Sequence, residues 1–218
     1  MTRTELLTEL REAVDDTAAP YMWSETRLRG FLSEGQDKFC EDTGLFVSLT
    51  PLILEEGKRD YDIPSRTIEV LEVFNGARPL RKWQTGQIPG LEPGAGMPSA
   101  WQADAATGLL RFDRTPTAAQ AGAELTLRRW HYSDTPLSSS VDGVAAAPQL
   151  PERLQRACIE WAAYKLLRFH DAEVEGSPEA LEHLQAYRDY VSEGKKWQRR
   201  HSSFEMSVGA TPAYMVSP

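Results

Sequence analysis

The spacing of apolar residues changes twice along the chain, and this change limits the fold more than any other feature of the sequence. Residues 4–44 repeat apolar side chains at the three- and four-residue spacing of amphipathic helices. Residues 45–133 form short runs, several of them alternating between apolar and polar, which are separated by Gly, Pro and Asn and are typical of strands. Helical spacing returns in residues 150–201. The predicted order is therefore two helices, a β-module and two more helices.

Each helical part is too small to bury its apolar stripe alone, so the two parts are expected to pack together. We therefore predict an α+β fold, a helical bundle formed by the N- and C-terminal helices, with an inserted antiparallel β-module and an extended C-terminal tail. The expected divisions are N-terminal helices at 1–44, the β-module at 45–133, a linker at 134–149, a helical hairpin at 150–201 that completes the bundle, and the tail at 202–218.

Local signals mark where several elements begin and end. Ser24 is expected to cap a helix that stops at Gly44, and Pro151 suits the first position of another helix. In the β-module, Asn75-Gly76 predicts a tight hairpin with both residues at positive φ, and residues 78–83 would be its return strand. The last helix is expected to bury one stripe: Leu181, Leu184, Tyr187, Val191 and Gly194.

Composition excludes several classes of protein. The formal net charge of −8 over 218 residues argues against a general nucleic-acid binder, which would carry a large basic surface. Cys40 and Cys158 are too few for a disulfide framework or a zinc site, and both are predicted to be buried free thiols. No signal-peptide pattern follows Met1, and no apolar run approaches the roughly 18 residues that span a bilayer. We expect a protein made in a reducing cytoplasm.

A search for chemistry predicts no catalytic residue, no metal site and no cofactor. The four histidines have no metal-binding spacing, and no Ser lies in a nucleophile-elbow motif. The Gly-rich segment at 90–96 lacks the Gly-Lys-Ser/Thr ending of a phosphate loop. The carboxylate pairs at 15–16, 41–42 and 55–56 lie at predicted helix or strand ends, where solvated acidic residues are ordinary.

The chain ends in a basic cluster and an apolar tail. Lys195, Lys196, Arg199 and Arg200 surround Trp197, and they allow two interpretations: cations that complement the dipole of a helix C-terminus, or a docking site for an acidic or nucleic-acid surface. The tail has no helical or strand period yet keeps large apolar side chains, which favours a partner surface. The candidate partner-binding residues are Lys195, Lys196, Trp197, Arg199, Arg200, Phe204, Met206, Tyr214 and Met215.

An ordered set of short segments gives the chain a family resemblance over residues 21–200. The segments are Trp23-Ser24-Glu25, residues 32–40, Tyr61-Asp62-Ile63-Pro64, Ile68-Glu69-Val70, the Asn75-Gly76 hairpin, Met97-Pro98-Ser99-Ala100-Trp101, residues 108–112 before Pro116, Leu150-Pro151, and Ala162-Ala163-Tyr164 before the Arg-rich helix end. Together they resemble the head-to-tail connector (portal adaptor, or head-completion) proteins of tailed phages. The segments at 86–96 and after Ser202 match no part of that pattern.

The resemblance implies a structural protein of the virion neck and no enzyme. Members of this family form rings, typically dodecamers, under the portal, extend the DNA channel and join the head to the tail. The implied partners are copies of the chain itself, the portal protein, a tail or further neck protein, and packaged double-stranded DNA that passes without sequence-specific binding. Two alternatives stay open: a DNA-binding accessory protein that uses the 195–201 cluster, and a small hydrolase that uses carboxylates of the β-module.

Overall fold

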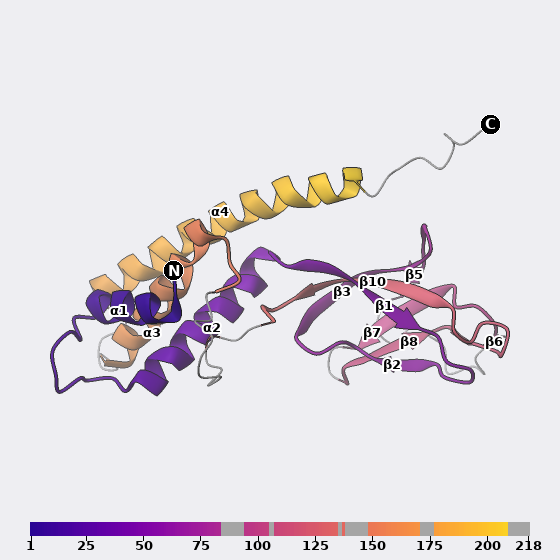
Figure 1. The fold of residues 1–218 in the computed structure, drawn as a ribbon, viewed down its shortest axis with the longest axis horizontal. Helices are drawn as coiled ribbons and strands as arrows, with labels where there is room; N and C mark the ends of the chain where they lie inside the picture. The colour runs from indigo at the N-terminus through magenta and orange to yellow at the C-terminus, as the bar shows by residue number, and fades with distance from the viewer. Residues whose placement is uncertain (84–93, 105–106, 135–136, 138–147, 171–176, 209–218) are drawn as a thin grey trace. The chain divides into compact units, whose positions relative to one another are not determined.

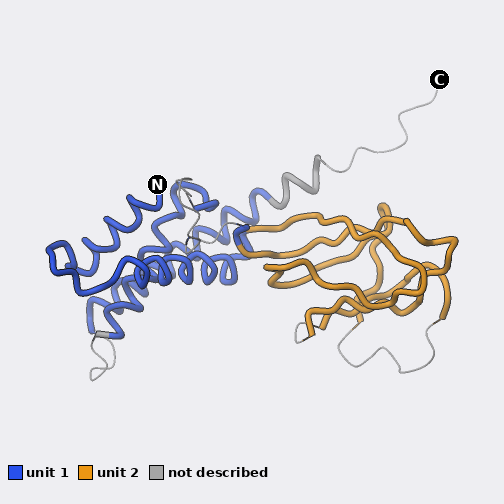
Figure 2. The backbone as a smooth tube through the Cα atoms, turned by 60° about the horizontal axis from the view of Figure 1, so that its bottom comes forward, with its two compact units in different colours: residues 1–45, 133–218 blue, residues 46–132 orange. Residues whose placement is uncertain are grey.

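The chain forms two compact units (Figure 2): residues 1–45 together with 133–218, and residues 46–132. The structure is a computed structural model, and it describes residues 1–83, 94–104, 107–134, 137, 148–170 and 177–208. The side chains of His170 and of residues 202–208 are outside this description. No described helix combines the length and the apolar character needed to cross a membrane.

Unit 1 is the helical bundle (Figure 1). Its elements are α1 (Arg3–Ala13), α2 (Glu25–Thr43), a short 3-10 helix (Glu152–Leu154), α3 (Arg156–His170) and α4 (Pro178–Val208). Capping explains where the first two helices begin and end. The Thr2 side chain accepts a hydrogen bond from the Glu5 N–H, and the Glu5 carboxylate accepts one from the Thr2 N–H. At the start of α2, the Ser24 hydroxyl accepts a hydrogen bond from the Arg27 N–H. Gly44 ends α2 in the left-handed conformation, with φ of 60°.

Helix α3 is the centre of the bundle, because it contacts α1, α2 and α4. Packing on three sides buries residues almost all around it, and several of them are alanines that let the neighbouring helices approach closely. The buried residues are Ala157, Cys158, Ile159, Ala162, Ala163 and Leu166. The closest approach is at Gly35 of α2, where a Cβ atom would lie 2.8 Å from the Cys158 carbonyl oxygen.

Unit 2 contains two four-stranded sheets around one core. One sheet has the order β1-β10-β3-β4, from Val47–Ile53, Glu124–His131, Thr67–Asn75 and Arg78–Pro79. The other has the order β2-β8-β7-β5, from Asp60–Asp62, Leu109–Phe112, Ala100–Asp104 and Arg81–Lys82. Short strands β6 (Gly94–Ala95) and β9 (Arg114–Thr115) pair with each other. The core is Leu54, Tyr61, Val70, Val73, Trp101, Leu110, Phe112, Leu125 and Leu127.

The predicted fold class is confirmed: helices from both ends of the chain form the bundle, and a mainly antiparallel β-module is inserted between them. Cys40 and Cys158 are free and buried, as predicted, and burial raises the pKa of the Cys158 thiol.

The predicted hairpin is present but its details were wrong. Asn75 pairs with Arg78, so the two turn residues are Gly76 and Ala77, and of these only Gly76 has positive φ, at 58°. The return segment also does not stay in one sheet. Residues 78–79 pair with β3, while residues 81–82 pair with β7 of the other sheet in the parallel direction. The return strand therefore passes from one sheet to the other.

Three helical details also differ from the prediction. Leu181, expected in the buried stripe of α4, is 54% exposed, and Ala180 is buried in its place. Phe169, expected on the apolar face of α3, is 56% exposed. Helix α4 continues to Val208, so residues 202–208 of the predicted extended tail are helical. The rest of that tail, residues 209–218, lies outside the described residues. So do residues 84–93, which include part of the Gly-rich segment, and most of the predicted linker, in which Leu137 is buried.

Candidate partner-binding surface

The last part of helix α4 extends past the bundle core. Ala180, Tyr187 and Gly194 are buried at a spacing of seven residues, which places one side of α4 against α2 and α3. After Gly194 no described side chain of α4 is buried. The yellow end of α4 runs beyond α1 and α3 in Figure 1. This part of the helix therefore presents its side chains to solvent within unit 1.

Four exposed cations lie on this part of the helix. Lys195, Lys196, Arg199 and Arg200 are exposed, and the sequence has no acidic residue between Glu193 and Glu205. Residues four apart are neighbours on a helix surface, so the cations form two like-charge pairs, each costing about 0.2–0.5 kcal/mol. The cluster is therefore a candidate partner-binding surface.

The position of the helix end bears on the dipole interpretation of this cluster. The helix dipole favours cations only within the last turn, and α4 has no basic residue there. Arg200 precedes Val208 by two turns at the helical repeat of about 3.6 residues. Complementing the helix dipole therefore does not explain the four cations.

Trp197 is held in place beside the cations. Its ring stacks on that of His201, with centroids 3.7 Å apart, and the His201 Nδ1 atom lies 2.9 Å from the Trp197 carbonyl oxygen. Trp197 is half-buried rather than enclosed. The structure thus brings five of the candidate residues onto one exposed helix segment. Phe204 and Met206 lie in the same helix without described side chains, and Tyr214 and Met215 lie outside the described residues.

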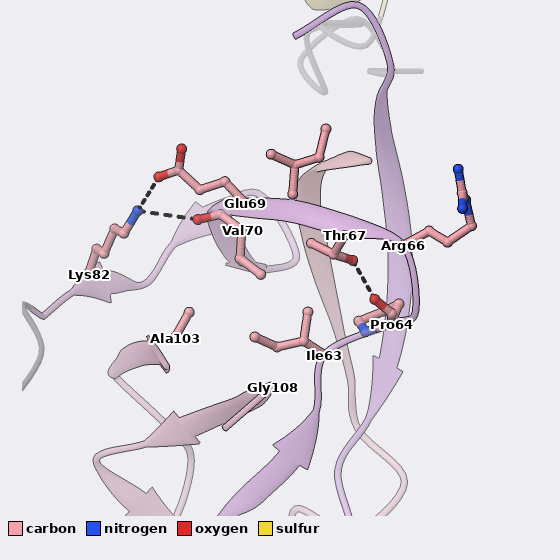
Figure 3. A pocket seen from close by; sticks show the side chains of 10 residues that line it. Ile63, Pro64, Arg66, Thr67, Glu69, Val70, Lys82, Ala103 and Gly108 are labelled. Atoms are coloured by element: carbon pink, nitrogen blue, oxygen red, sulfur yellow. Dashed lines mark hydrogen bonds and ion pairs between the residues drawn. The ribbon is translucent and has the colours of Figure 1, made fainter. Parts of the chain in front are cut away.

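Unit 2 contains a cavity of about 360 Å³ (Figure 3). Ile63, Val70 and Ala103 line its apolar part. At its rim, the Lys82 ammonium donates to Glu69 at 3.0 Å and to the Val70 carbonyl at 3.2 Å. The Arg66 side chain points away from the cavity in Figure 3. The only carboxylate among the described lining residues is already paired, so this cavity offers no free acid–base pair.

Unit 1 contains an acidic cavity of about 480 Å³. Its titratable lining residues are Glu12, Asp15, Glu160, Glu179, Glu182 and His183. The His183 Nδ1 atom lies 2.7 Å from a Glu160 oxygen. This hydrogen bond raises the pKa of His183 against the opposing effect of burial. His183 is the only side-chain hydrogen-bond donor among the described lining residues, so the cavity has little with which to stabilise the anion that develops in hydrolysis.

One residue of each carboxylate pair noted in the sequence takes a structural role. Asp16 accepts hydrogen bonds from the Arg11 guanidinium and the Met22 N–H, Asp42 accepts from Tyr187, and Glu55 pairs with Lys58. Among the residues that the structure describes, no three His, Cys, Asp or Glu side chains group as metal ligands would.

The His183–Glu160 pair should make bundle stability depend on pH. A pKa raised by folding means that the stabilisation is fully present below the ordinary His pKa and is lost as the pH rises through the raised value. For a partly buried pair we expect roughly 0.5–1 kcal/mol. The native chain should therefore lose a few degrees of melting temperature relative to His183→Gln between about pH 6 and pH 8. If the difference in melting temperature between the two chains were the same at both pH values, this would contradict the prediction.

Sequence reasoning missed one exposed surface of the bundle. Tyr21, Met22 and Phe169 are 54%, 61% and 56% exposed, and they lie near Trp23 and Phe31. Helical spacing had placed Phe31 and Phe169 in apolar stripes, and only the packed structure shows that these stripes extend past the core.

The family model described as SU10 adaptor protein matches residues 1–211 of the chain. No curated protein matches it.

Proposed function

The chain belongs to the SU10 adaptor protein family, and we propose that it forms a ring under the portal of a tailed phage, extends the DNA channel and joins the head to the tail. The family is one of phage structural adaptors, so the chain is a structural virion component and the resemblance seen in its sequence is confirmed. The ring, its dodecameric number, the portal contact and the passage of DNA are the proposed part.

The exposed basic end of α4 is the observation that supports portal docking. It places four cations and Trp197 on a helix that continues beyond the bundle core. Charges at the rim of an interface steer the encounter of two proteins, and Trp and Arg are frequent at the residues that dominate binding energy. We propose that residues 195–218 dock on an acidic surface of the portal, with Phe204, Met206, Tyr214 and Met215 supplying apolar contacts.

The overall charge supports a channel that does not retain DNA. The chain has 32 acidic residues against 24 Lys and Arg, a net charge of −8. Contacts between Lys or Arg and phosphates dominate DNA affinity. A ring built from such acidic subunits would let packaged DNA slide through without binding it.

The same four cations support a second candidate, a DNA-binding accessory protein. Four phosphate contacts would give DNA affinity a log–log salt slope of about −3.6. Such binding would fall about 100-fold or more between 50 and 200 mM salt.

Binding of the full-length chain to its cognate portal protein and to duplex DNA, measured side by side at 50 and 200 mM salt, separates the two candidates. We expect portal binding to persist at 200 mM salt, because apolar tail contacts support it, and DNA binding to be weak at both. Absence of portal binding would overturn the proposal. Tight, steeply salt-dependent DNA binding that is lost when Lys195, Lys196, Arg199 and Arg200 are replaced by Ala would support the second candidate instead.

A further inference from the structure

Large exposed apolar side chains are concentrated in two places. Among the described residues, six such side chains are at least half exposed: Tyr21, Met22, Leu49, Ile53, Phe169 and Leu181. Single exposed apolar residues are ordinary on a protein surface, but contiguous groups mark interaction sites. Three of the six gather on unit 1 and two on unit 2, so each unit has one such patch.

The patch on unit 1, here the aromatic patch, consists of Tyr21, Met22, Trp23, Arg27, Phe31 and Phe169. Buried Asp16, which is 6% exposed, fixes the loop that carries the first three of these residues. Its carboxylate accepts hydrogen bonds from the Arg11 guanidinium at 2.6 Å, the Met22 N–H at 2.7 Å and the Trp23 N–H at 3.3 Å. The Arg11 guanidinium also lies 3.9 Å from the centre of the Tyr21 ring.

These contacts hold Tyr21 and Met22 in exposed positions. A loop fixed before binding loses little conformational entropy when a partner arrives. The ion pair thus keeps two large apolar side chains in solvent, which favours a binding role for them.

Arg27 gives the aromatic patch a positive charge. Its guanidinium carbon lies 4.7 Å, 5.9 Å and 5.6 Å from the ring centres of Trp23, Phe31 and Phe169. No described carboxylate forms an ion pair with Arg27, whereas neighbouring Arg29 pairs with Glu25. Aromatic residues, Met and Arg are the types enriched at protein interfaces. The patch therefore suits an apolar partner surface that carries one negative charge.

The patch on unit 2, here the β1 face, consists of Leu49, Pro51, Ile53 and Glu124. Successive side chains of a strand alternate between its two faces, so the three odd-numbered residues of β1 share one face. Leu49 is 67% exposed and Ile53 is 50% exposed. Glu124 pairs with Ile53 across β1 and β10, which puts it on the same face. Glu124 is exposed, and no described cation forms an ion pair with it.

The open edges of this sheet are unsuited to pairing with another strand. The Leu54 N–H and C=O groups form hydrogen bonds on the side of β10. Ser48, Thr50 and Leu52 lie an even number of residues from Leu54, so their backbone N–H and C=O groups also face β10. The backbone groups of Leu49, Pro51 and Ile53 therefore face the open edge of the sheet. Pro51 has no N–H to donate there. On β3, the Val70 carbonyl accepts a hydrogen bond from the Lys82 ammonium. Lys and Pro are common protections of sheet edges. A partner would therefore contact the side chains of the β1 face rather than add a strand.

We propose that the aromatic patch of one copy of the chain packs on the β1 face of the next copy, with Arg27 of one facing Glu124 of the other. Each patch is apolar with one unpaired charge, and the two charges are opposite. Because the two surfaces differ, the contact repeats from copy to copy and can close into a ring. The inference rests on the proposed ring and identifies its subunit interface.

Disulfide trapping between two variants that each gain one exposed cysteine tests the contact in full-length protein. Met22→Cys and Leu49→Cys are each purified and then oxidised alone and as a mixture. The native chain, whose two cysteines are buried, is the background control. A mixed dimer can form only between two molecules, so contacts within one chain do not interfere. We expect at least about tenfold more covalent dimer in the mixture than in either variant alone. Equal yields in the mixture and the single variants would overturn the proposal.

A charge exchange tests the Arg27–Glu124 pairing within the same assay. Arg27→Glu in the Met22→Cys chain should lower the yield of mixed dimer about tenfold, because it places like charges opposite each other. Adding Glu124→Arg to the Leu49→Cys chain should restore it. Lack of recovery would overturn this pairing. The assay contains no portal, so its failure is distinguishable from a failure of portal binding.

Discussion

Reversal of the four cations at the end of α4 is expected to weaken portal binding by at least about 100-fold, which corresponds to about 2.7 kcal/mol. The variant carries Lys195→Glu, Lys196→Glu, Arg199→Glu and Arg200→Glu. All four side chains are exposed and lie past the last buried described residue of α4, Gly194, so the bundle should remain folded. If this surface meets an acidic portal surface, attraction becomes repulsion, which costs several kcal/mol across an interface. Titration of labelled chain with portal rings at physiological salt measures the change.

A control reverses two exposed arginines elsewhere on the bundle. Arg168 and Arg188 are suitable because both are exposed, lie before the basic end and form no ion pair with a described carboxylate. Their reversal should change portal affinity less than about threefold, as expected of charges away from the contact. Equal losses in both variants would mean that only net charge matters. Unchanged affinity in the first variant would remove the basic end from the portal contact.

The same assay distinguishes the contribution of the tail to portal binding from that of the four cations. Deletion of residues 202–218 removes Phe204, Met206, Tyr214 and Met215 while keeping residues 195–200. Weaker binding of the truncated chain is expected, because those side chains are proposed to bury apolar surface on the portal. Equal binding by the truncated and full-length chains would contradict a role for the tail.

Gly35→Ala is expected to destabilise the bundle by about 3 kcal/mol. The new Cβ atom would lie 2.8 Å from the Cys158 carbonyl oxygen and 3.1 Å from the Cys158 Cα atom. These are backbone atoms of the central helix, so no side chain can rotate away and α2 must move from α3. Overpacking of a well-packed core typically costs 1–3 kcal/mol. Urea unfolding of the native and variant chains measures the loss.

Gly30→Ala in the same helix is the matched control. No atom lies within 4 Å of the Cβ position at Gly30, so the substitution gains helix propensity and should stabilise by about 0.5–1 kcal/mol. The two variants should therefore change stability in opposite directions. A stabilising Gly35→Ala would contradict the close crossing of α2 and α3. At Gly194 the nearest atoms belong to the side chains of Phe39 and Thr43, which can shift, so Ala should be tolerated better there.

Features set by neighbouring residues were predictable from the sequence. Ser24 and Gly44 bound α2 as expected, because capping depends on residues within one turn. The bundle and β-module division also followed from the local spacing of apolar residues.

Features that depend on distant segments were not predictable. Residues 78–83 divide between two sheets because residues 81–82 pair with β7, about 20 positions later. The turn moved to Gly76–Ala77 because the ladder pairs Asn75 with Arg78. Phe169 fits a helical stripe, yet it is exposed because the neighbouring helices pack elsewhere on α3. Helix α4 passes the end of its apolar stripe, because extending an existing helix needs no further packing.

The candidate site was predictable only in part. The cation cluster was visible as a run of charges, but its position two turns before the helix end was not, and that position removed the dipole explanation. The aromatic patch was missed because Phe31 and Phe169 have the spacing of core residues.

The mass of the complex between the full-length chain and its cognate portal tests the central proposal most directly. Portal rings mixed with excess chain, freed of unbound protein and measured by native mass spectrometry, report how many copies each portal carries. The ring proposal predicts a single population in which every portal carries one complete ring, expected to be a dodecamer, with no large share of partly filled portals. Portals that carry no chain, or a broad distribution of one or a few copies, would contradict it.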